Sequence, residues 1–371
     1  MNNKNPKYVD IKNFILNEIT TKGLAPGTKL FTEKELCDSF NVCRVTVQLA
    51  LADLQKSGDI YRIKGSGTFV GSPDDIKSET VHHDIRHKFI PFIISNNSPS
   101  SRSLEMIAGA EDYLKTKSCF VTIHTAQGDF IAEQEIINSL VKSGIRAMIV
   151  LPFHSDRNVQ FYFELVKRNI KIVFIDLLPN GIVANLVSSN NVLGGYLMTK
   201  HLFENGYRRI AVISGETKVA TSYTERISGY NFAYLEAGLP VNDDYILTLK
   251  SSDDQMLRDE IPPAVARLMS LPNPPDAIFC LNDLIAFNAY NSLQKLGIKV
   301  PDDVGLTGFD NLPLSSKNHV QITTIDQHFH SIGYSAAKLC YESITSDFPG
   351  YTHLSLPVTL IERESSRSKK S

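Results

Sequence analysis

The hydrophobic positions of this chain follow two patterns. Up to about residue 70, apolar residues such as Ile11, Ile15 and Ile19 recur every three or four positions, which is typical of short amphipathic helices. From Phe89 onward, short continuous apolar runs alternate with amphipathic segments, which indicates buried strands between helices. We therefore expect a small N-terminal domain followed by an α/β domain.

The N-terminal pattern predicts a winged helix-turn-helix, a module that sits on duplex DNA. Thr32 and Glu35 form a T-x-x-E capping box that starts one helix, and a second helix is expected over residues 44–57. Two short strands, 60–63 and 68–70, then surround a glycine-rich hairpin tip.

The charge of this segment agrees with DNA binding. Residues 1–72 carry ten Lys and Arg against seven Asp and Glu, whereas the whole chain has a net charge of −2. The alternative is a helix-turn-helix used only for protein packing, which would leave the basic Lys34, Arg44 and Lys64 without a role.

The second part of the chain reads as an α/β fold with doubly wound parallel sheets. Continuous apolar strands between amphipathic helices are buried on both faces, as parallel strands are. Two such sheets in series predict two lobes with a cleft between them, where ligands bind at the carboxyl ends of the strands. The expected strands are 89–95, 120–124, 147–151, 172–175, 210–214, 277–281 and 305–309.

Composition excludes several other classes. No apolar run approaches the ~20 residues of a membrane span, and the polar N-terminus does not resemble a signal peptide. The five cysteines are scattered and odd in number, which favours unpaired thiols in a reducing, cytoplasmic setting. No metal site and no cofactor are expected. His82, His83 and His87 fit a solvated linker better than a metal site.

Four motifs resemble the GntR-type DNA-binding domain over residues 6–72: LAPG (24–27), TEKEL (32–36), NVCRVTV (41–47) and GSGTFV (65–70). The resemblance implies that Arg44 opens the recognition helix and reads guanine, and that Lys64 and Gly65 enter a minor groove. The residues implied in DNA binding are Lys7, Tyr8, Thr32, Lys34, Arg44, Val45, Thr46, Gln48, Lys64, Gly65 and Ser66.

Two positions depart from that family's pattern. Cys43 stands where a serine or threonine usually precedes the arginine, and because a thiol is a poor N-cap, the helix start is expected to be weaker by ~1 kcal/mol. Gln48 stands where a second arginine is usual, and glutamine reads adenine, so a different operator preference is expected.

A second set of motifs resembles the LacI-type effector domain, a relative of periplasmic sugar-binding proteins, over residues 89–362. The motifs are NVLGG (191–195), GYRRI (206–210), RISGY (226–230), PDAIFCLND (275–283) and VPDDVGLTGFD (300–310). The implied organisation is a DNA-binding domain (1–72), a linker (73–88), a two-lobed periplasmic-binding-protein-like effector and dimerisation domain (89–364) and a disordered tail (365–371). The pairing of the two domains resembles the AraR group of arabinose-responsive repressors.

The resemblance points to Arg226, Asn282 and Asp310 as effector ligands, because guanidinium, amide and carboxylate groups suit paired hydroxyls. Asp283 is expected to be the N-cap of the helix after its strand. Candidates from the first lobe are Ser98, Ser101, Arg102, Asp129, His154 and Asp176, although Asp176 is equally a structural loop carboxylate. Tyr223, Phe153 or Phe309 would supply an aromatic face, or belong to the core.

These features predict a homodimeric regulator, not an enzyme, that leaves operator DNA when a small neutral sugar binds. A phosphosugar or purine effector is the alternative, but a phosphate would need more cations than Arg226 and Arg102 supply. Two other classes fit less well. A GntR-type head fused to a transaminase-like body needs a longer domain with a Schiff-base lysine, and a free solute receptor would carry no DNA-binding head.

Overall fold

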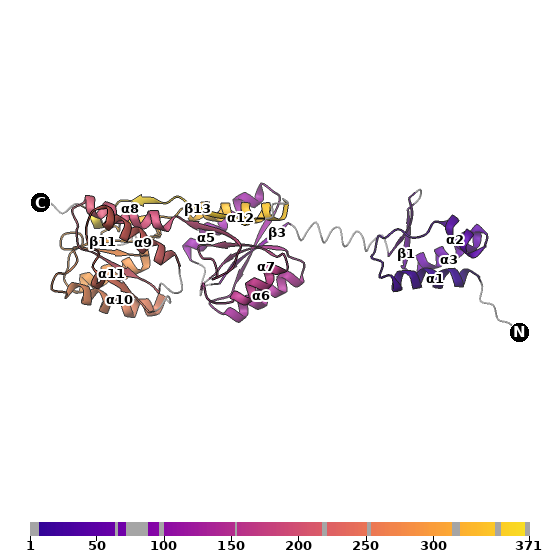
Figure 1. Cartoon of the computed structure of the whole chain (residues 1–371), viewed down its shortest axis with the longest axis horizontal. Coiled ribbons are helices and arrows are strands. Elements are labelled where there is room, and N and C mark those ends of the chain that lie inside the picture. Colours follow the sequence, from indigo (N-terminus) through magenta and orange to yellow (C-terminus); the bar gives the residue numbers. More distant parts are fainter. Residues whose placement is uncertain are drawn as a thin grey trace. The chain divides into compact units, whose positions relative to one another are not determined.

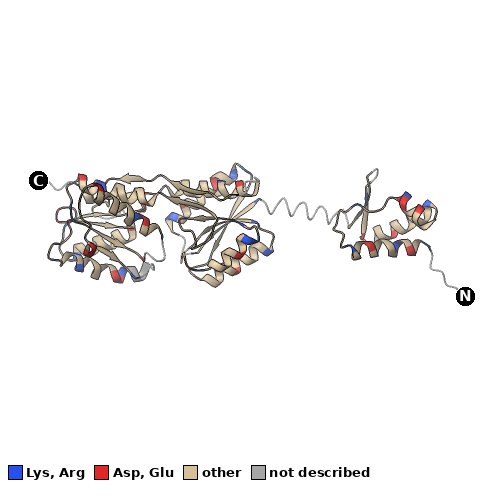
Figure 2. Cartoon of the chain, in the orientation of Figure 1, with Lys and Arg blue, Asp and Glu red and all other residues tan. Residues whose placement is uncertain are grey.

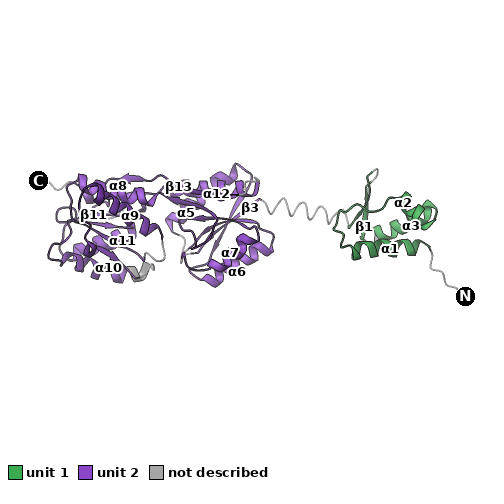
Figure 3. Ribbon diagram, in the orientation of Figure 1, with its two compact units in different colours: residues 1–87 green, residues 88–371 purple. Residues whose placement is uncertain are grey.

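The chain divides into two units, residues 1–87 and residues 88–371 (Figure 3). The computed structural model describes residues 7–63, 66–71, 88–95, 100–152, 154–216, 221–250, 254–313, 320–345 and 350–367. Lys64, Gly65, Ser98, Phe153, the expected linker over 73–87 and the end of the tail lie outside these residues.

Unit 1 is the expected winged helix-turn-helix. Helices α1 (Lys7–Thr21), α2 (Glu33–Phe40) and α3 (Arg44–Lys56) precede the hairpin of β1 (Ile60–Ile63) and β2 (Gly67–Val70) (Figure 1). They share one small core, in which the following side chains are buried: Ile11, Ile15, Leu36, Val47, Ala50, Leu51, Leu54 and Ile60.

Local chemistry fixes the ends of these helices as the sequence indicated. The Thr32 hydroxyl accepts from the Glu35 backbone N–H at 3.2 Å, and Glu35 Oε2 accepts from the Thr32 N–H at 2.7 Å, which completes the capping box. Asn41 turns the chain in the left-handed region at φ 46°. Cys43 is the N-cap of α3 and makes no side-chain capping bond.

The first lobe of unit 2 is built on a six-stranded parallel sheet of order β13-β7-β6-β5-β3-β4. Its strands are β3 (Phe89–Ile94), β4 (Phe120–Thr125), β5 (Ala147–Leu151), β6 (Lys171–Ile175), β7 (Asn185–Ser189) and β13 (His353–Leu356). Helices α5 (Ser101–Lys115), α6 (Phe130–Lys142), α7 (Val159–Lys167) and α12 (Phe329–Thr345) belong to the same lobe, with α12 packed against α5 (Figure 1).

The second lobe has a four-stranded parallel sheet of order β11-β10-β8-β9. Its strands are β8 (Ile210–Ser214), β9 (Ile246–Thr248), β10 (Ala277–Cys280) and β11 (Gly305–Thr307). Its helices are α8 (Asn191–Glu204), α9 (Thr221–Glu236), α10 (Asp254–Met269) and α11 (Asp283–Lys295), with the short turns η1 (Asp243–Tyr245) and η3 (Glu364–Ser366). The antiparallel pair of β12 (Thr324–Asp326) and β14 (Thr359–Ile361) completes it.

The two sheets are therefore not simply in series. The chain passes from the first lobe to the second after β7, returns between β12 and α12, and passes again between β13 and β14. The buried residues Phe329, Ile332 and Cys340 of α12 join the core of the first lobe, although they lie more than 100 residues after its other helices. The chain therefore crosses between the lobes three times.

The C-terminal boundary expected at Ser365 is wrong. Ser365 and Ser366 are buried in η3, where the Ser365 hydroxyl accepts from the Thr323 N–H at 2.8 Å and the His201 ring bonds the Ser366 hydroxyl at 2.8 Å. Hydrogen bonds of serine hydroxyl groups hold this segment in place. Hydrophobic periodicity in the sequence therefore could not reveal that it is ordered.

Candidate functional site

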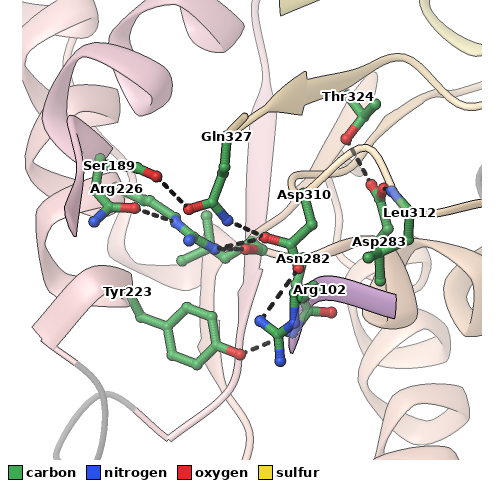
Figure 4. Close-up of polar contacts among 12 residues, drawn as sticks. Arg102, Ser189, Tyr223, Arg226, Asn282, Asp283, Asp310, Leu312, Thr324 and Gln327 are labelled. Carbon is green, nitrogen blue, oxygen red and sulfur yellow. Dashed lines mark hydrogen bonds and ion pairs between the residues drawn. The ribbon is translucent and has the colours of Figure 1, made fainter. Parts of the chain in front are cut away.

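Asp310 is the centre of a polar cluster where the two lobes meet (Figure 4). It follows β11, is 2% exposed and has φ 116°, a strained conformation for an L-residue, held by the bond from its N–H to the Ile325 carbonyl at 2.8 Å. Its carboxylate lies 3.7 Å from Nη1 of Arg226 in the second lobe and 3.6 Å from Nη1 of Arg102 in the first. One carboxylate thus contacts a guanidinium group from each lobe.

Burial is the main influence on the pKa of the Asp310 carboxylate. It raises the pKa of Asp310, and the guanidinium groups of Arg102 and Arg226 oppose the rise. The charge of Asp176, in the first lobe, also raises the pKa of Asp310. Asp176 is therefore a second carboxylate close to the cluster.

Close helix packing positions Arg226, which is only 3% exposed. A Cβ on Gly195 of α8 would lie 2.1 Å from the Arg226 carbonyl oxygen, so glycine is what allows α9 to approach α8. The guanidinium lies 3.8 Å from the centre of the Phe309 ring, and its Nε donates to Asn191 Oδ1 at 2.9 Å. Nη1 also donates to the Leu281 carbonyl at 2.5 Å, so two of its nitrogens already have protein partners.

Asn282 caps α11, and the expectation that Asp283 would do so is wrong. Asn282 Oδ1 accepts from the Ile285 N–H at 2.7 Å, and its Nδ2 donates to the Tyr223 hydroxyl at 2.7 Å (Figure 4). The cap and the Tyr223 bond leave Asn282 one N–H and one lone pair of its Oδ1 for a ligand. Backbone geometry decides this, because residue 282 is the last with extended φ and ψ before the helix.

Asp283 is instead a buried carboxyl that holds the segment after Asp310. It accepts from the Thr324 hydroxyl and from the Leu312 N–H, each at 2.7 Å. Burial, followed by the charge of Asp310, raises the pKa of Asp283 to about 8. This carboxyl is therefore largely protonated at neutral pH.

The candidates of the first lobe fall into two groups. Arg102 reaches Asp310, and Ser101 is half-buried at the start of α5 beside it. Asp129 is the N-cap of α6 and accepts from the Ile131 and Ala132 N–H groups, so its carboxylate already has a structural role. Asp176 has φ 65°, and its N–H donates to the Val187 carbonyl.

His154 occupies a different part of the first lobe. Its ring meets that of Phe130 edge-on at 5.3 Å, and its Nδ1 lies 4.0 Å from Asp156. Burial lowers the pKa of His154, while the charges of Asp156 and of Glu216 in the second lobe raise it. Glu216 therefore lies close enough to His154 to affect the pKa of its ring.

Gln327 is a member of the cluster that the sequence reasoning missed. Its Nε2 donates to Asp310 Oδ1 at 2.5 Å, and its Oε1 accepts from the Ser189 hydroxyl at 2.7 Å (Figure 4). Ser189 ends β7 and Gln327 follows β12, so both lie on segments that connect the lobes. Neither residue follows an expected strand, and no local pattern marked them.

Of the aromatic candidates, Phe309 belongs to the core. Its ring is fully buried, with Arg226 on one side, and a Cβ on Gly194 would lie 2.6 Å from it. Tyr223 is half-buried, its hydroxyl accepts from Asn282, and its ring centre lies 5.7 Å from the Arg226 guanidinium.

In unit 1, Glu33 holds Arg44, which is expected to read DNA, and Arg62 of β1, which was not among the expected DNA-binding residues. Its Oε2 accepts from Arg44 Nε at 2.6 Å and from Gln48 Nε2 at 3.4 Å, and its Oε1 accepts from Arg62 of β1. The bond from Arg44 holds the pKa of Glu33 below its usual range. Arg44 makes this contact through its Nε, and its side chain is 74% exposed. Sequence spacing did not predict Glu33 or Arg62, because these side chains meet across 29 residues of the chain.

The other residues implied in DNA binding lie on the helices and the wing. Lys34, Val45, Gln48 and Ser66 are exposed, whereas Tyr8 packs against the core and Thr32 is occupied by the capping box. Lys7 Nζ lies 3.5 Å from the Asn41 carbonyl, and the Thr46 hydroxyl lies 3.3 Å from the Cys43 sulfur. Basic and acidic side chains are interspersed over unit 1 (Figure 2).

Comparisons with known proteins find relatives for both units of the chain. The model of the gntR family of bacterial regulatory proteins matches residues 7–70, and the model of the periplasmic binding protein-like domain matches residues 199–366. An arabinose metabolism transcriptional repressor of Geobacillus stearothermophilus is 27% identical over 348 residues, 91% of each chain. The HTH-type transcriptional repressor PurR of Vibrio parahaemolyticus is 31% identical over 243 residues, 65% of this chain and 70% of the relative.

Solved structures show the same fold. The transcriptional regulator CelR in its cellobiose complex superposes with a TM-score of 0.66 at 20% identity, covering 87% of this chain and 91% of that one. A LacI family transcriptional regulator from Enterococcus faecium with bound ribose gives a TM-score of 0.63 at 22% identity, covering 76% of this chain and all of that one.

The fold and the two sites define a transcriptional repressor with a DNA-binding head and a ligand-binding body. The chain belongs to the family in which a GntR-type winged helix-turn-helix precedes a LacI-type, periplasmic-binding-protein-like domain. Among the residues that the structure describes, no helix is long and apolar enough to cross a membrane.

Proposed function

We propose that this repressor binds operator DNA as a homodimer and leaves it when a small neutral sugar, arabinose or a related pentose or deoxyhexose, binds between its lobes. The observation that carries this proposal is the position of Asp310, which contacts Arg102 of one lobe and Arg226 of the other. A ligand bound there touches both lobes, so it favours one relative position of the lobes over another.

The charge of the cluster favours a neutral polyol. Arg102 and Arg226 are offset by Asp310, and Asp176 adds negative potential close by. A phosphate would meet these carboxylates, whereas sugar hydroxyls can donate to Asp310 and accept from guanidinium N–H groups. Relatives named as arabinose metabolism repressors support arabinose as the first sugar to test.

The remaining parts of the proposal follow from DNA binding. A two-fold dimer reads a two-fold operator, and we place dimerisation in the effector domain. The protein acts in the cytoplasm and is not an enzyme, so a bound sugar should be recovered unchanged.

A thermal-shift screen tests the effector. Unit 2 should gain about 5 °C with a neutral sugar at a hundred times its Kd. Arg226→Lys should abolish the shift because lysine cannot maintain the stacked, multiply bonded geometry, and Arg168→Lys, an exposed site on the first lobe, should retain it. A shift only with phosphosugars or purines would contradict the neutral-sugar proposal, and consumption of the sugar would contradict the non-enzymatic one.

A further inference from the structure

Two large apolar side chains are exposed on the recognition helix α3. Val45 is 63% exposed and Leu49 is 57% exposed, and they lie four residues apart, one turn above the other. The core face of the same helix is formed by Val47, Leu51 and Leu54, which are buried. Val45 and Leu49 therefore do not contribute to the core, and we refer to these two residues as the apolar strip.

A polar row runs beside the apolar strip. Arg44 and Gln48 each precede a member of the strip by one residue, and both are exposed. Glu33 accepts from Arg44 Nε, and the Arg44 side chain is nevertheless 74% exposed. Hydrogen-bonding and apolar groups thus occupy adjacent rows of one exposed helix face.

The strip is too small to be a protein interface. Stable protein contacts bury about 1,200 Å² or more, and the strip offers two side chains. It ends toward Asp53, which is ion-paired with Lys12 at 2.9 Å. An occupant must therefore be a small apolar group that lies next to hydrogen-bonding base edges, and in the major groove that group is the 5-methyl of thymine.

We propose that Val45 and Leu49 read thymine methyl groups in the operator, a specificity role that rests on the proposed DNA binding through α3. The Cα atoms of residues four apart are separated by about 6 Å along a helix. Base pairs are stacked about 3.4 Å apart, so the strip spans two thymines one or two base pairs from each other. The operator half-site accordingly carries this thymine pair beside the base read by Arg44.

The test uses the full chain and duplexes that it selects from a randomised library. Each thymine of the selected duplex is then replaced by deoxyuridine, which removes only the methyl group. Two replacements should each weaken binding by the wild-type chain about fourfold, the effect of one buried methyl-sized group. The double variant Val45→Ala/Leu49→Ala should bind thymine and deoxyuridine duplexes equally.

Leu235→Ala is the matched control, because Leu235 of α9 is 75% exposed but lies in unit 2. It should keep the full deoxyuridine penalty. If the double variant fails to fold, Val45→Ser alone should still remove one of the two penalties. Equal wild-type binding to both duplexes, or an undiminished penalty in the variants, overturns this proposal while operator binding stands. Failure to select any duplex overturns the proposed function as well.

Discussion

Gln327 joins Asp310 to Ser189, with bonds of 2.5 Å to the carboxylate and 2.7 Å from the serine hydroxyl. It therefore connects the centre of the polar cluster to two of the segments that link the lobes. A change in the position of Asp310 on ligand binding would be transmitted directly to these segments, which gives the cluster a route to lobe movement.

Gln327→Met should weaken sugar binding roughly tenfold or more, because it removes a charge-assisted hydrogen bond from a buried carboxylate while keeping the side-chain volume. Isothermal titration calorimetry measures the loss. Gln160→Met, on the exposed face of α7, is the control and should bind the sugar normally. Wild-type affinity in Gln327→Met would show that the carboxylate does not depend on this bond.

Glu33→Gln should weaken operator binding roughly tenfold, because the carboxylate holds Arg44 and Arg62 in place for the DNA. Asp38→Asn, on the same helix, makes the same change in charge and should leave binding unchanged or slightly stronger. Fluorescence anisotropy at two salt concentrations compares them. Tighter binding by Glu33→Gln than by Asp38→Asn would mean that Glu33 competes with DNA for the arginines.

Asp283→Asn should change how stability depends on pH. The folded pKa of Asp283, about 8, lies above its unfolded value of 3.8, so the folded state binds the extra proton between these values. Its contribution is complete below about pH 4 and is lost as the pH rises toward 8, by at most about 1.4 kcal/mol for each pH unit. Asparagine can still bond Leu312 and Thr324 but does not titrate.

Chemical denaturation of the wild type and Asp283→Asn at pH 5.5 and 7.5 measures this effect. The difference in unfolding free energy between the two proteins should shift by about 2–3 kcal/mol across that interval, with the wild type relatively more stable at pH 5.5. No shift would mean that Asp283 is ionised in the folded protein.

Cys43→Ser should stabilise unit 1 by about 1 kcal/mol, because a serine hydroxyl can accept a first-turn N–H that the thiol leaves without a side-chain cap. Thermal unfolding monitored by circular dichroism detects the gain. Cys37→Ser, a half-buried position inside α2, should give no gain. An equal gain in both variants would mean that it comes from removing a thiol and not from capping α3.

The sequence predicted most local structure, because caps and periodicity are local. The capping box at Thr32, the three helices of unit 1 and the alternation of strands and helices were confirmed. The placement of α12 and β13 in the first lobe was not predictable, because hydrophobic periodicity does not tell which sheet a late segment joins. Gln327 and Glu33 were missed for a related reason, since their partners lie on elements distant in sequence.

Strand ends were the most useful guide to the effector site. Asn282 and Asp310 follow β10 and β11, and the structure brings Arg226 and Arg102 to the same cluster. Their role as sugar ligands stays a prediction. The sequence could not show which polar atoms of these residues already bond to other parts of the protein. Asn282 Oδ1, for example, caps α11.

The central claim is that sugar binding in unit 2 releases DNA held by unit 1. The most direct measurement is the anisotropy of a labelled operator duplex, titrated with the full chain in the presence and absence of L-arabinose. We predict that saturating sugar raises the operator Kd at least tenfold, which is a coupling of about 1.4 kcal/mol, and that Arg226→Lys abolishes the change. Unchanged or tighter operator binding, with sugar binding verified by calorimetry, would contradict the account.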